Sequence, residues 1–528
     1  MQQKTTLFTL WMLLFSSFAF AQEPQFFMTQ QGENKDIIPQ HFLGKDGRYF
    51  WYLGYEVRQH HNIGGGISPV IFKLDIDLQV VEAHALEVDE KDLHFLREAV
   101  LLDNTIYLLV QKDEKAGWHT DIYFDRYDLK GKALQPLTVM DINLKPEIFM
   151  GLPVRKKYSA SSPDQNWFYF CFYDQNDLGD HPLPLEMSIV NLRSGEATTH
   201  RIELKEGKKH VENLQFLGTN NGEALMLYES NYAGPLKRKY PKTKKNKQTY
   251  PLNTSKLIKI NQAGDKSELI LYEGKDFVRT ARMKLGNDDF LYYTDLLSID
   301  ESNTAQSIYN VKKITPEALE IVKEVSEVFQ KEHFSNLDGF DLNDGQYGLP
   351  IGAVIQDIFP GADGKMKIIY RHSYLPTLQS NVTTYTFHES IFVLSLKEDG
   401  SVEWAVTLPQ GLLADARLRE GGIRARESDG SLLILFNSVP KIINKTYTEV
   451  PKVGEARSIR MNNTTTAYFV IDQKGNYRKR IVFEDTKIAA DLGEIGELSD
   501  HEFSFPVFSF KKASKPTGVL VKAIFGQD

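Results

Sequence analysis

Residues 162–172 read Ser162-Pro163-Asp164-Gln165-Asn166-Trp167-Phe168-Tyr169-Phe170-Cys171-Phe172, which is a turn followed at once by a nearly continuous apolar run. The same order of a Gly, Asp or Asn turn and then an apolar run occurs seven times, at intervals of about 55 to 75 residues, a recurrence typical of repeat architectures. The seven runs are 49–52, 106–110, 167–172, 224–228, 290–293, 366–370 and 432–436. Because such runs suit strands that are covered on both faces, each one predicts a buried middle strand of a sheet.

A second strand pattern follows each run, in residues 70–75, 122–128, 187–192, 257–261, 308–311, 391–396 and 468–472. Most of these patterns end in Asp or Asn and a turn such as Lys130-Gly131, and an outer strand such as 402–408 comes next. Each unit is therefore predicted to be a four-stranded antiparallel meander. Several meanders around a common axis cover the faces that a single one would expose, so the predicted fold is an all-β β-propeller.

The units resemble blades of the TolB-like and WD40-like propeller superfamilies, most clearly at Ser162-Pro163-Asp164 before the Trp167 strand. Residues 394–404, Leu-Ser-Leu-Lys-Glu-Asp-Gly-Ser-Val-Glu-Trp, are similar to a quinoprotein-type blade. The resemblance implies a propeller fold and carries no catalytic or binding residue with it.

The number of blades depends on both ends of the chain. Residues 503–510 and 518–525 predict two further strands after the seventh unit, and Phe26-Phe27-Met28-Thr29 predicts an N-terminal strand able to complete the same blade. We therefore predict seven full four-stranded blades plus an eighth, closing blade made from both termini. The rival is seven blades in all, with the extra pair of strands packed elsewhere.

Residues 22–528 are predicted to form this single domain, with long loop insertions near 229–254, 315–350, 371–388 and 437–465. Residues 316–332 contain the one candidate helix, because Thr315 and Pro316 precede an apolar stripe at helical spacing. The alternative for the same residues is the outer strand of the fifth unit.

The N-terminus has the three parts of a secretory signal peptide. Lys4 precedes an apolar run over residues 7–20, and Ala19-Phe20-Ala21 supplies a small-x-small cleavage site. We predict that residues 1–21 are removed after Ala21 and that the protein is periplasmic or secreted; a buried N-terminal helix is the alternative. The residue after the cleavage site is not Cys, so we do not expect a lipoprotein, and no later segment is apolar for long enough to span a bilayer.

Composition excludes some classes of function. The chain has 62 Lys and Arg against 70 Asp and Glu, a formal net charge of −8, which argues against a general nucleic-acid binder. Cys171 is the single cysteine, so no intramolecular disulfide can form. Its place within an apolar run predicts a buried small hydrophobe rather than a nucleophile.

In a propeller, the loops between second and third strands emerge on the same face as the connections between blades, and here those loops are the long ones. We expect ligands to bind on this face, because rigid scaffolds often carry binding sites on such loops. The candidate ligand-binding residues are His60, His61, Trp118, His119, His181, Arg371, His372, Tyr374 and His388. Histidines on one face could ligate a metal, and aromatics with Arg could stack on a sugar ring. The alternative is that polar loops contain these residues without any such role.

Two charged loops are further candidates. Seven cations in a short insertion predict contact with an anionic surface, the alternative being a solvated insertion: Lys237, Arg238, Lys239, Lys242, Lys244, Lys245 and Lys247. Asp338, Asp341 and Asp344 could bind calcium, although their spacing departs from the EF-hand order and a plain turn is the favoured interpretation. No other cofactor is predicted.

The sequence contains no G-x-S-x-G nucleophile motif and does not nominate a catalytic carboxylate pair. We predict an exported propeller that binds a ligand, a glycan or an envelope or extracellular protein through its loop-rich face. The alternative is an extracytoplasmic polysaccharide hydrolase or lyase. Channel-facing pairs of Asp or Glu beside aromatic platforms would favour the enzyme.

Overall fold

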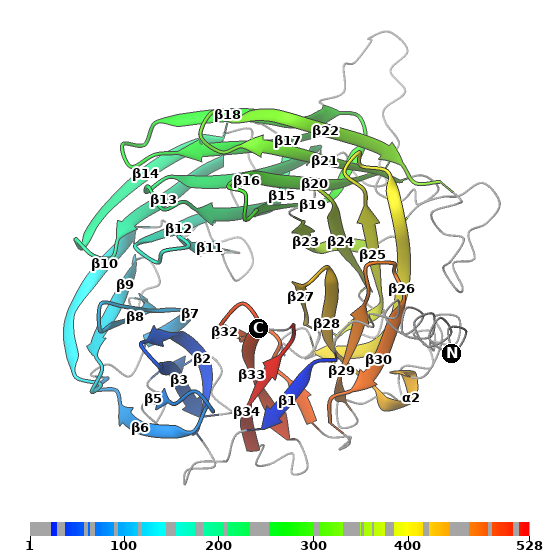
Figure 1. Cartoon of the computed structure of the whole chain (residues 1–528). Coiled ribbons are helices and arrows are strands. Elements are labelled where there is room, and N and C mark those ends of the chain that lie inside the picture. The colour runs from blue at the N-terminus through cyan, green and yellow to red at the C-terminus, as the bar shows by residue number, and fades with distance from the viewer. Residues whose placement is uncertain are drawn as a thin grey trace, which may run out of the picture.

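The computed structural model describes residues 23–28, 37–56, 62–63, 69–88, 93–113, 119–143, 155–174, 183–204, 209–232, 253–298, 307–330, 349, 353–361, 364–374, 385–415, 422–443, 464–483, 488–509 and 517–526. Their strands form seven four-stranded antiparallel meanders arranged in a ring, and the seventh meander shares one nine-stranded sheet with strands from both chain ends (Figure 1). The predicted β-propeller is confirmed. Within these ranges, no helix is long and apolar enough to cross a membrane.

The meanders follow one another along the chain and are numbered here as blades 1 to 7. Blades 1 to 4 are β2 (Ile37–Asp46), β3 (Tyr49–Glu56), β5 (Val70–Leu74) and β6 (Val80–Ala85); β7 (Leu93–Leu102), β8 (Thr105–Asp113), β9 (His119–Asp128) and β10 (Ala133–Asn143); β11 (Arg155–Ser161), β12 (Trp167–Asp174), β13 (Leu183–Asn191) and β14 (Glu196–Leu204); β15 (Lys209–Gly218), β16 (Ala224–Tyr232), β17 (Asn253–Ile260) and β18 (Lys266–Gly274). Blades 5 to 7 are β19 (Phe277–Leu285), β20 (Leu291–Ser298), β21 (Ser307–Thr315) and β22 (Glu320–Val328); β23 (Ala353–Pro360), β24 (Met366–Tyr374), β25 (Tyr385–Leu396) and β26 (Val402–Asp415); β27 (Ile423–Ser428), β28 (Ser431–Ser438), β29 (Thr465–Ile471) and β30 (Tyr477–Ile481). The short strand β4 (Asn62–Ile63) pairs with β7, and the short helix α2 (Pro440–Ile443) follows β28.

Both ends of the chain build blade 8. Its strands are β31 (Ile488–Ala490), β32 (Gly496–Glu497), β33 (Glu502–Ser509), β34 (Thr517–Ile524) and, from the N-terminus, β1 (Gln25–Met28). β1 runs antiparallel to β34, with Gln25 opposite Ile524 and Met28 opposite Val521. The predicted pairing of strands from both termini is therefore confirmed. β29 of blade 7 also pairs with β31, so these strands and blade 7 form one nine-stranded sheet. The number of blades, seven or eight, stays a prediction, and the name blade 8 is kept for this set of strands.

Side-chain packing closes the ring between blades 8 and 1. Leu498 and Leu520 of blade 8 pack against Phe50 and Tyr52 of blade 1, and the Tyr52 hydroxyl lies 2.5 Å from Ser504 Oγ. Hydrophobic clusters of the same kind fill the other seven interfaces between neighbouring blades. Each blade thus buries both faces against its neighbours, which explains why middle strands such as β20 and β28 are buried at every position.

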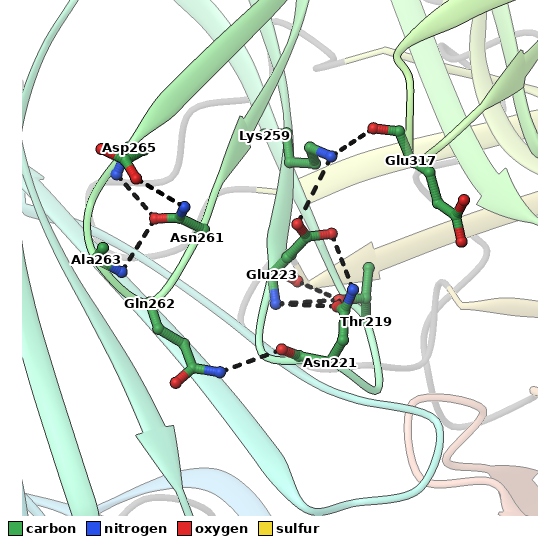
Figure 2. Close-up of polar contacts among 9 residues, drawn as sticks. All are labelled: Thr219, Asn221, Glu223, Lys259, Asn261, Gln262, Ala263, Asp265 and Glu317. Carbon is green, nitrogen blue, oxygen red and sulfur yellow. Dashed lines mark hydrogen bonds and ion pairs between the residues drawn. The ribbon is translucent and has the colours of Figure 1, made fainter.

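Asp and Asn side chains shape the turns between third and fourth strands. In blade 4, Asn261 Oδ1 accepts hydrogen bonds from the backbone N–H groups of Ala263, at 3.0 Å, and Asp265, at 2.9 Å (Figure 2). Asp75, Asp128 and Asp472 make the same two contacts in blades 1, 2 and 7. Such a side chain substitutes for a backbone turn, which is the physical reason for the recurring Asp or Asn at the end of the third strand.

Residues 320–328 form β22, so the helix predicted over residues 316–332 is wrong and its alternative, the outer strand of the fifth unit, is correct. Leu319 adopts a left-handed conformation (φ 54°) and ends a turn that begins at Thr315. The chain then returns to pair with β21. Val322 is 53% exposed, so the apolar stripe that suggested a helix lies on an outer strand.

Cys171 lies on β12, where it is fully buried in the cluster between blades 3 and 4. Burial raises the pKa of its thiol well above the usual value. The prediction of a buried small hydrophobe is confirmed.

Candidate binding site at the channel mouth

Most of the residues predicted to bind ligands lie outside the described residues. These are His60, His61, Trp118 and His181, the cations of the insertion (Lys237, Arg238, Lys239, Lys242, Lys244, Lys245 and Lys247), and Asp338, Asp341 and Asp344. His119 begins β9 and Tyr374 ends β24. Their roles stay predictions. Among the residues that the structure describes, no group of three His, Cys, Asp or Glu side chains is placed to hold a metal ion.

The structure brings together Arg371, His372 and His388, which lie on β24 and β25 rather than in the loop between them. His388 Nδ1 is 2.8 Å from Ser373 Oγ, and the His388 side chain is buried. Burial and the nearby Arg371 guanidinium lower the pKa of His388 to about 3. His388 is therefore neutral at physiological pH, and its binding role stays a prediction.

A cavity of about 840 Å³ opens on the other face of the ring. Its lining comes from blades 5 to 8, at the turns between first and second strands, and includes Gly286 and Asn287, Pro360 and Gly361, and Ser428 to Gly430. In an antiparallel meander these turns are on the face opposite the loops between second and third strands. We call the two faces the turn face and the loop face. This cavity thus lies on the face that loop length did not indicate.

Three ion pairs connect the blades around this cavity, each between a cation on one blade and a carboxylate on the next. Lys284 Nζ of blade 5 is 3.2 Å from Asp357 Oδ1 of blade 6. Lys367 of blade 6 bonds to Glu427 of blade 7, and Arg426 of blade 7 bonds to Glu497 of blade 8. A fourth pair, Lys365 Nζ with Glu403 Oε1 at 2.9 Å, lies within blade 6. The cavity wall therefore alternates hydrogen-bond donors and acceptors. Each ion pair holds both of its side chains in place.

Two aromatic rings line the same cavity, and each has a cation beside its face. Lys284 Nζ lies 4.1 Å from the centroid of the Phe359 ring, and the Arg426 guanidinium lies 5.4 Å from the centroid of Phe503. Such placement favours the cation electrostatically and holds it in position. The aromatic side chains thus support the charged wall.

On the turn face of blade 4, outside the cavity, a lysine makes a similar polar contact with the next blade. Lys259 Nζ donates to the backbone carbonyl of Glu317 in blade 5 at 2.6 Å and lies 3.6 Å from Glu223 Oε1 (Figure 2). Lys259 thus connects neighbouring blades as the cavity lysines do. None of these residues lines the cavity.

Sequence reasoning missed the cavity residues. A local signal exists, since the first strands of blades 5 and 7 carry cations close to their ends, as in Arg424-Ala425-Arg426. That signal does not reveal the partners, because each ion pair between blades joins residues at least 60 positions apart.

Comparisons with known proteins give distant structural similarities only. No family model matches the chain, and no curated protein matches it. The chain is similar in structure to the WD40 domain of SCAP from fission yeast, with a TM-score of 0.37 and 8% identity over 95% of this chain and 98% of that one. It is also similar to prolyl oligopeptidase B from Galerina marginata, with a TM-score of 0.36 and 8% identity over 90% of this chain and 56% of that one. An α-L-arabinanase from Penicillium chrysogenum matches with a TM-score of 0.33 and 11% identity, over 67% of this chain and 93% of that one.

Proposed function

We propose that this protein is an exported β-propeller that binds a glycan in the cavity on its turn face. The observation that carries the proposal is the wall of alternating cations and carboxylates around an open volume of about 840 Å³. A sugar hydroxyl both donates and accepts hydrogen bonds, so it can bridge an ammonium and a carboxylate that are already held together. A ligand group that only donates or only accepts hydrogen bonds would match only one partner of each ion pair.

Binding is favoured over hydrolysis because most carboxylates of the cavity are paired with a cation. The sequence criterion for an enzyme, channel-facing carboxylates beside aromatic residues, is met in composition at this cavity. However, four of the six carboxylates that line the cavity, Asp357, Glu403, Glu427 and Glu497, each bond to a lysine or arginine. Among the described residues, the other two, Asp429 and Asp500, have no ion pair with a cation. A glycosidase needs one carboxyl group that carries a proton to the leaving oxygen, and a carboxylate held beside a cation is poorly suited to that role.

Export rests on residues 1–21 and their secretory pattern. An exported protein meets extracellular and envelope polysaccharides, which agrees with a glycan as ligand. Cleavage after Ala21 can be tested by N-terminal sequencing of the protein recovered from outside the cytoplasm. Retention of residues 1–21 on protein found in the cytoplasm would contradict export.

The test of binding is isothermal titration calorimetry of the purified protein with neutral and acidic oligosaccharides. A double variant, Lys365→Gln with Glu403→Gln, removes one ion pair of the cavity without changing net charge. We expect it to bind any glycan ligand at least about tenfold more weakly, the loss expected for one or two hydrogen bonds to charged groups. The matched control is Lys73→Gln with Glu82→Gln, an ion pair of blade 1 that does not line the cavity. Equal affinity in both double variants, or hydrolysis of a bound glycan, would contradict the proposal.

A further inference from the structure

Arg424 differs from the other cations that line the cavity. It is exposed, and its Nε donates a hydrogen bond to the backbone carbonyl of Leu492 at 2.8 Å. Lys284, Lys365, Lys367 and Arg426 each have a carboxylate within ion-pair distance, whereas the described residues supply none to Arg424. Its carbonyl contact orients the guanidinium but does not neutralise its charge.

A second guanidinium reinforces this positive charge. Arg282 lies on β19 two residues before Lys284, on the same face of the strand, and no carboxylate of the described residues lies within ion-pair distance of it. Burial lowers the pKa of Arg282; the charge of Asp357 opposes this shift, and the charge of Arg424 adds to it. Arg282 does not line the cavity itself, and it adds to the positive charge behind Arg424.

The carboxylate whose charge acts on Arg282 already has other hydrogen-bond donors. Asp357 Oδ1 accepts hydrogen bonds from Lys284 Nζ at 3.2 Å and from the backbone N–H of Ile358 at 2.8 Å. Like charges repel each other, and an anion bound to Arg424 relieves that repulsion. A planar guanidinium also matches the geometry of a carboxylate or a sulfate oxygen pair.

Carboxylates without an ion pair also line the cavity. Among the described lining residues these are Asp429 and Asp500, and both are exposed. They disfavour a ligand with a negative charge on every sugar. A ligand with one anionic group placed at Arg424 and neutral sugars beside these carboxylates avoids this repulsion.

We propose that Arg424, with Arg282 behind it, binds the anionic group of a sparsely charged acidic oligosaccharide, a uronate carboxylate or a sulfate ester. This inference rests on the proposed glycan-binding function and specifies its ligand class. It involves no covalent step.

The experiment compares two matched pairs of probes by calorimetry. Aldotetraouronic acid, a xylotriose that carries one glucuronic acid, is compared with xylotetraose. Neocarrabiose 4-sulfate is compared with its desulfated disaccharide. We expect one acidic member to bind about ten- to a hundredfold more tightly than its neutral partner, a range typical of charge-assisted hydrogen bonds. The identity of that member separates the carboxylate from the sulfate.

Variants locate the effect. Arg424→Gln should remove the preference for the acidic probe over its neutral partner, and Arg424→Lys should keep part of the preference because it keeps the charge. Arg282→Gln provides a second variant with the same expected direction. Arg201→Gln is the control, because Arg201 is exposed on the outer strand β14 and lies 4.0 Å from Glu186. Melting temperatures of all variants show whether each one is folded.

The outcomes separate the two proposals. Equal binding of acidic and neutral probes, unchanged by Arg424→Gln, would overturn the arginine site and leave glycan binding in place. Failure of both probe pairs, together with failure of the wider glycan panel, would overturn glycan binding itself. A preference for the acidic probe that survives both arginine variants would place its anionic group elsewhere and also overturn this inference.

Discussion

Two polar clusters in this ring use carboxylates in opposite ways. Around the cavity, lysines, arginines and carboxylates face an open volume. Between blades 4 and 5, Asp295 accepts hydrogen bonds from the Tyr293 hydroxyl at 2.7 Å and from Asn310 Nδ2 at 2.6 Å, and the Tyr293 hydroxyl is also 2.9 Å from Ser255 Oγ. Asp295 is fully buried. The buried cluster satisfies its polar groups internally and has no room for a ligand, whereas the cavity wall can exchange partners with one.

The largest expected effect concerns the charge of Asp295. Burial raises its pKa to about 7, although the hydrogen bonds from Tyr293 and Asn310 favour the charged form. The folded protein therefore keeps a proton that the unfolded chain releases near pH 3.8, so this group makes the folded state less stable as pH rises from about 4 to 7. Asp295→Asn should remove that dependence. We expect its free energy of unfolding, relative to wild type, to increase by about 1.4 kcal/mol per pH unit, roughly 4 kcal/mol in all.

Urea unfolding at a series of pH values measures this difference. Asp77→Asn is the control, because Asp77 is exposed in a turn of blade 1. A constant difference between Asp295→Asn and wild type from pH 4 to 8 would mean that Asp295 is not protonated in the folded state.

The next effect is at the interface between blades 1 and 8. An ion pair there is less exposed than the cavity pairs but is not fully buried like Asp295. His41 Nδ1 is 2.6 Å from Glu494 Oε2, whose side chain is 5% exposed. Burial lowers the pKa of His41, but the hydrogen bond and charge of Glu494, with Glu98, outweigh it and raise the pKa overall. Stability from this pair is present below pH 6.5 and is lost as pH rises through the folded-state pKa.

His41→Gln should therefore lower the free energy of unfolding by about 3 kcal/mol at pH 6, since it leaves a buried carboxylate without its cation. The loss should shrink at pH 9, where wild-type His41 has released its proton. His84→Gln, at the exposed contact with Glu82, should change little at either pH. A loss of equal size at both pH values would show that the charge of His41 does not contribute.

How much of this contrast could be predicted from sequence depends on how local each feature is. The run 432–436 and the turn at Asp128-Leu129-Lys130-Gly131 report on neighbouring residues, so they predicted a buried middle strand and a hairpin correctly. The strand patterns at the two ends of the chain predicted a shared closing blade, because each end could supply the strand that the edge of the other needs. The stripe in 316–332 failed because its helical spacing says nothing about the free edge of β21, which β22 fills.

The cavity could not be predicted for a different reason. Lys284, Arg424 and Glu497 come from three blades, and their proximity depends on the rotation between blades. Long loops are visible in a sequence, which is why the loop face ranked first. The space left between the side chains of several blades is not visible in a sequence.

A smaller effect tests the donor in the buried cluster. Tyr293→Phe removes the O–H that Asp295 accepts, and we expect a loss of about 2 kcal/mol at pH 8, where Asp295 is charged, and less at pH 5. Tyr107→Phe is the control, because the Tyr107 hydroxyl donates to the neutral carbonyl of Leu192 at 2.9 Å and its loss should not depend on pH. Identical pH dependence in the two variants would contradict a charged acceptor at Tyr293.

The smallest effect on stability is expected at the cavity, where it completes the comparison. Lys367→Gln with Glu427→Gln removes an ion pair between blades 6 and 7 whose side chains are 11% and 21% exposed. We expect the free energy of unfolding to change by no more than about 1 kcal/mol, because the removed attraction and the removed desolvation cost offset each other and both amides can still hydrogen-bond. Glycan affinity should fall at least about tenfold in the same protein.

Lys312→Gln with Glu324→Gln, an ion pair on blade 5 outside the cavity, should change stability by a similar amount and leave glycan affinity unchanged. If the cavity variant instead lost several kcal/mol and kept its affinity, its charges would belong with the buried cluster, as structural contacts between blades rather than as a binding wall.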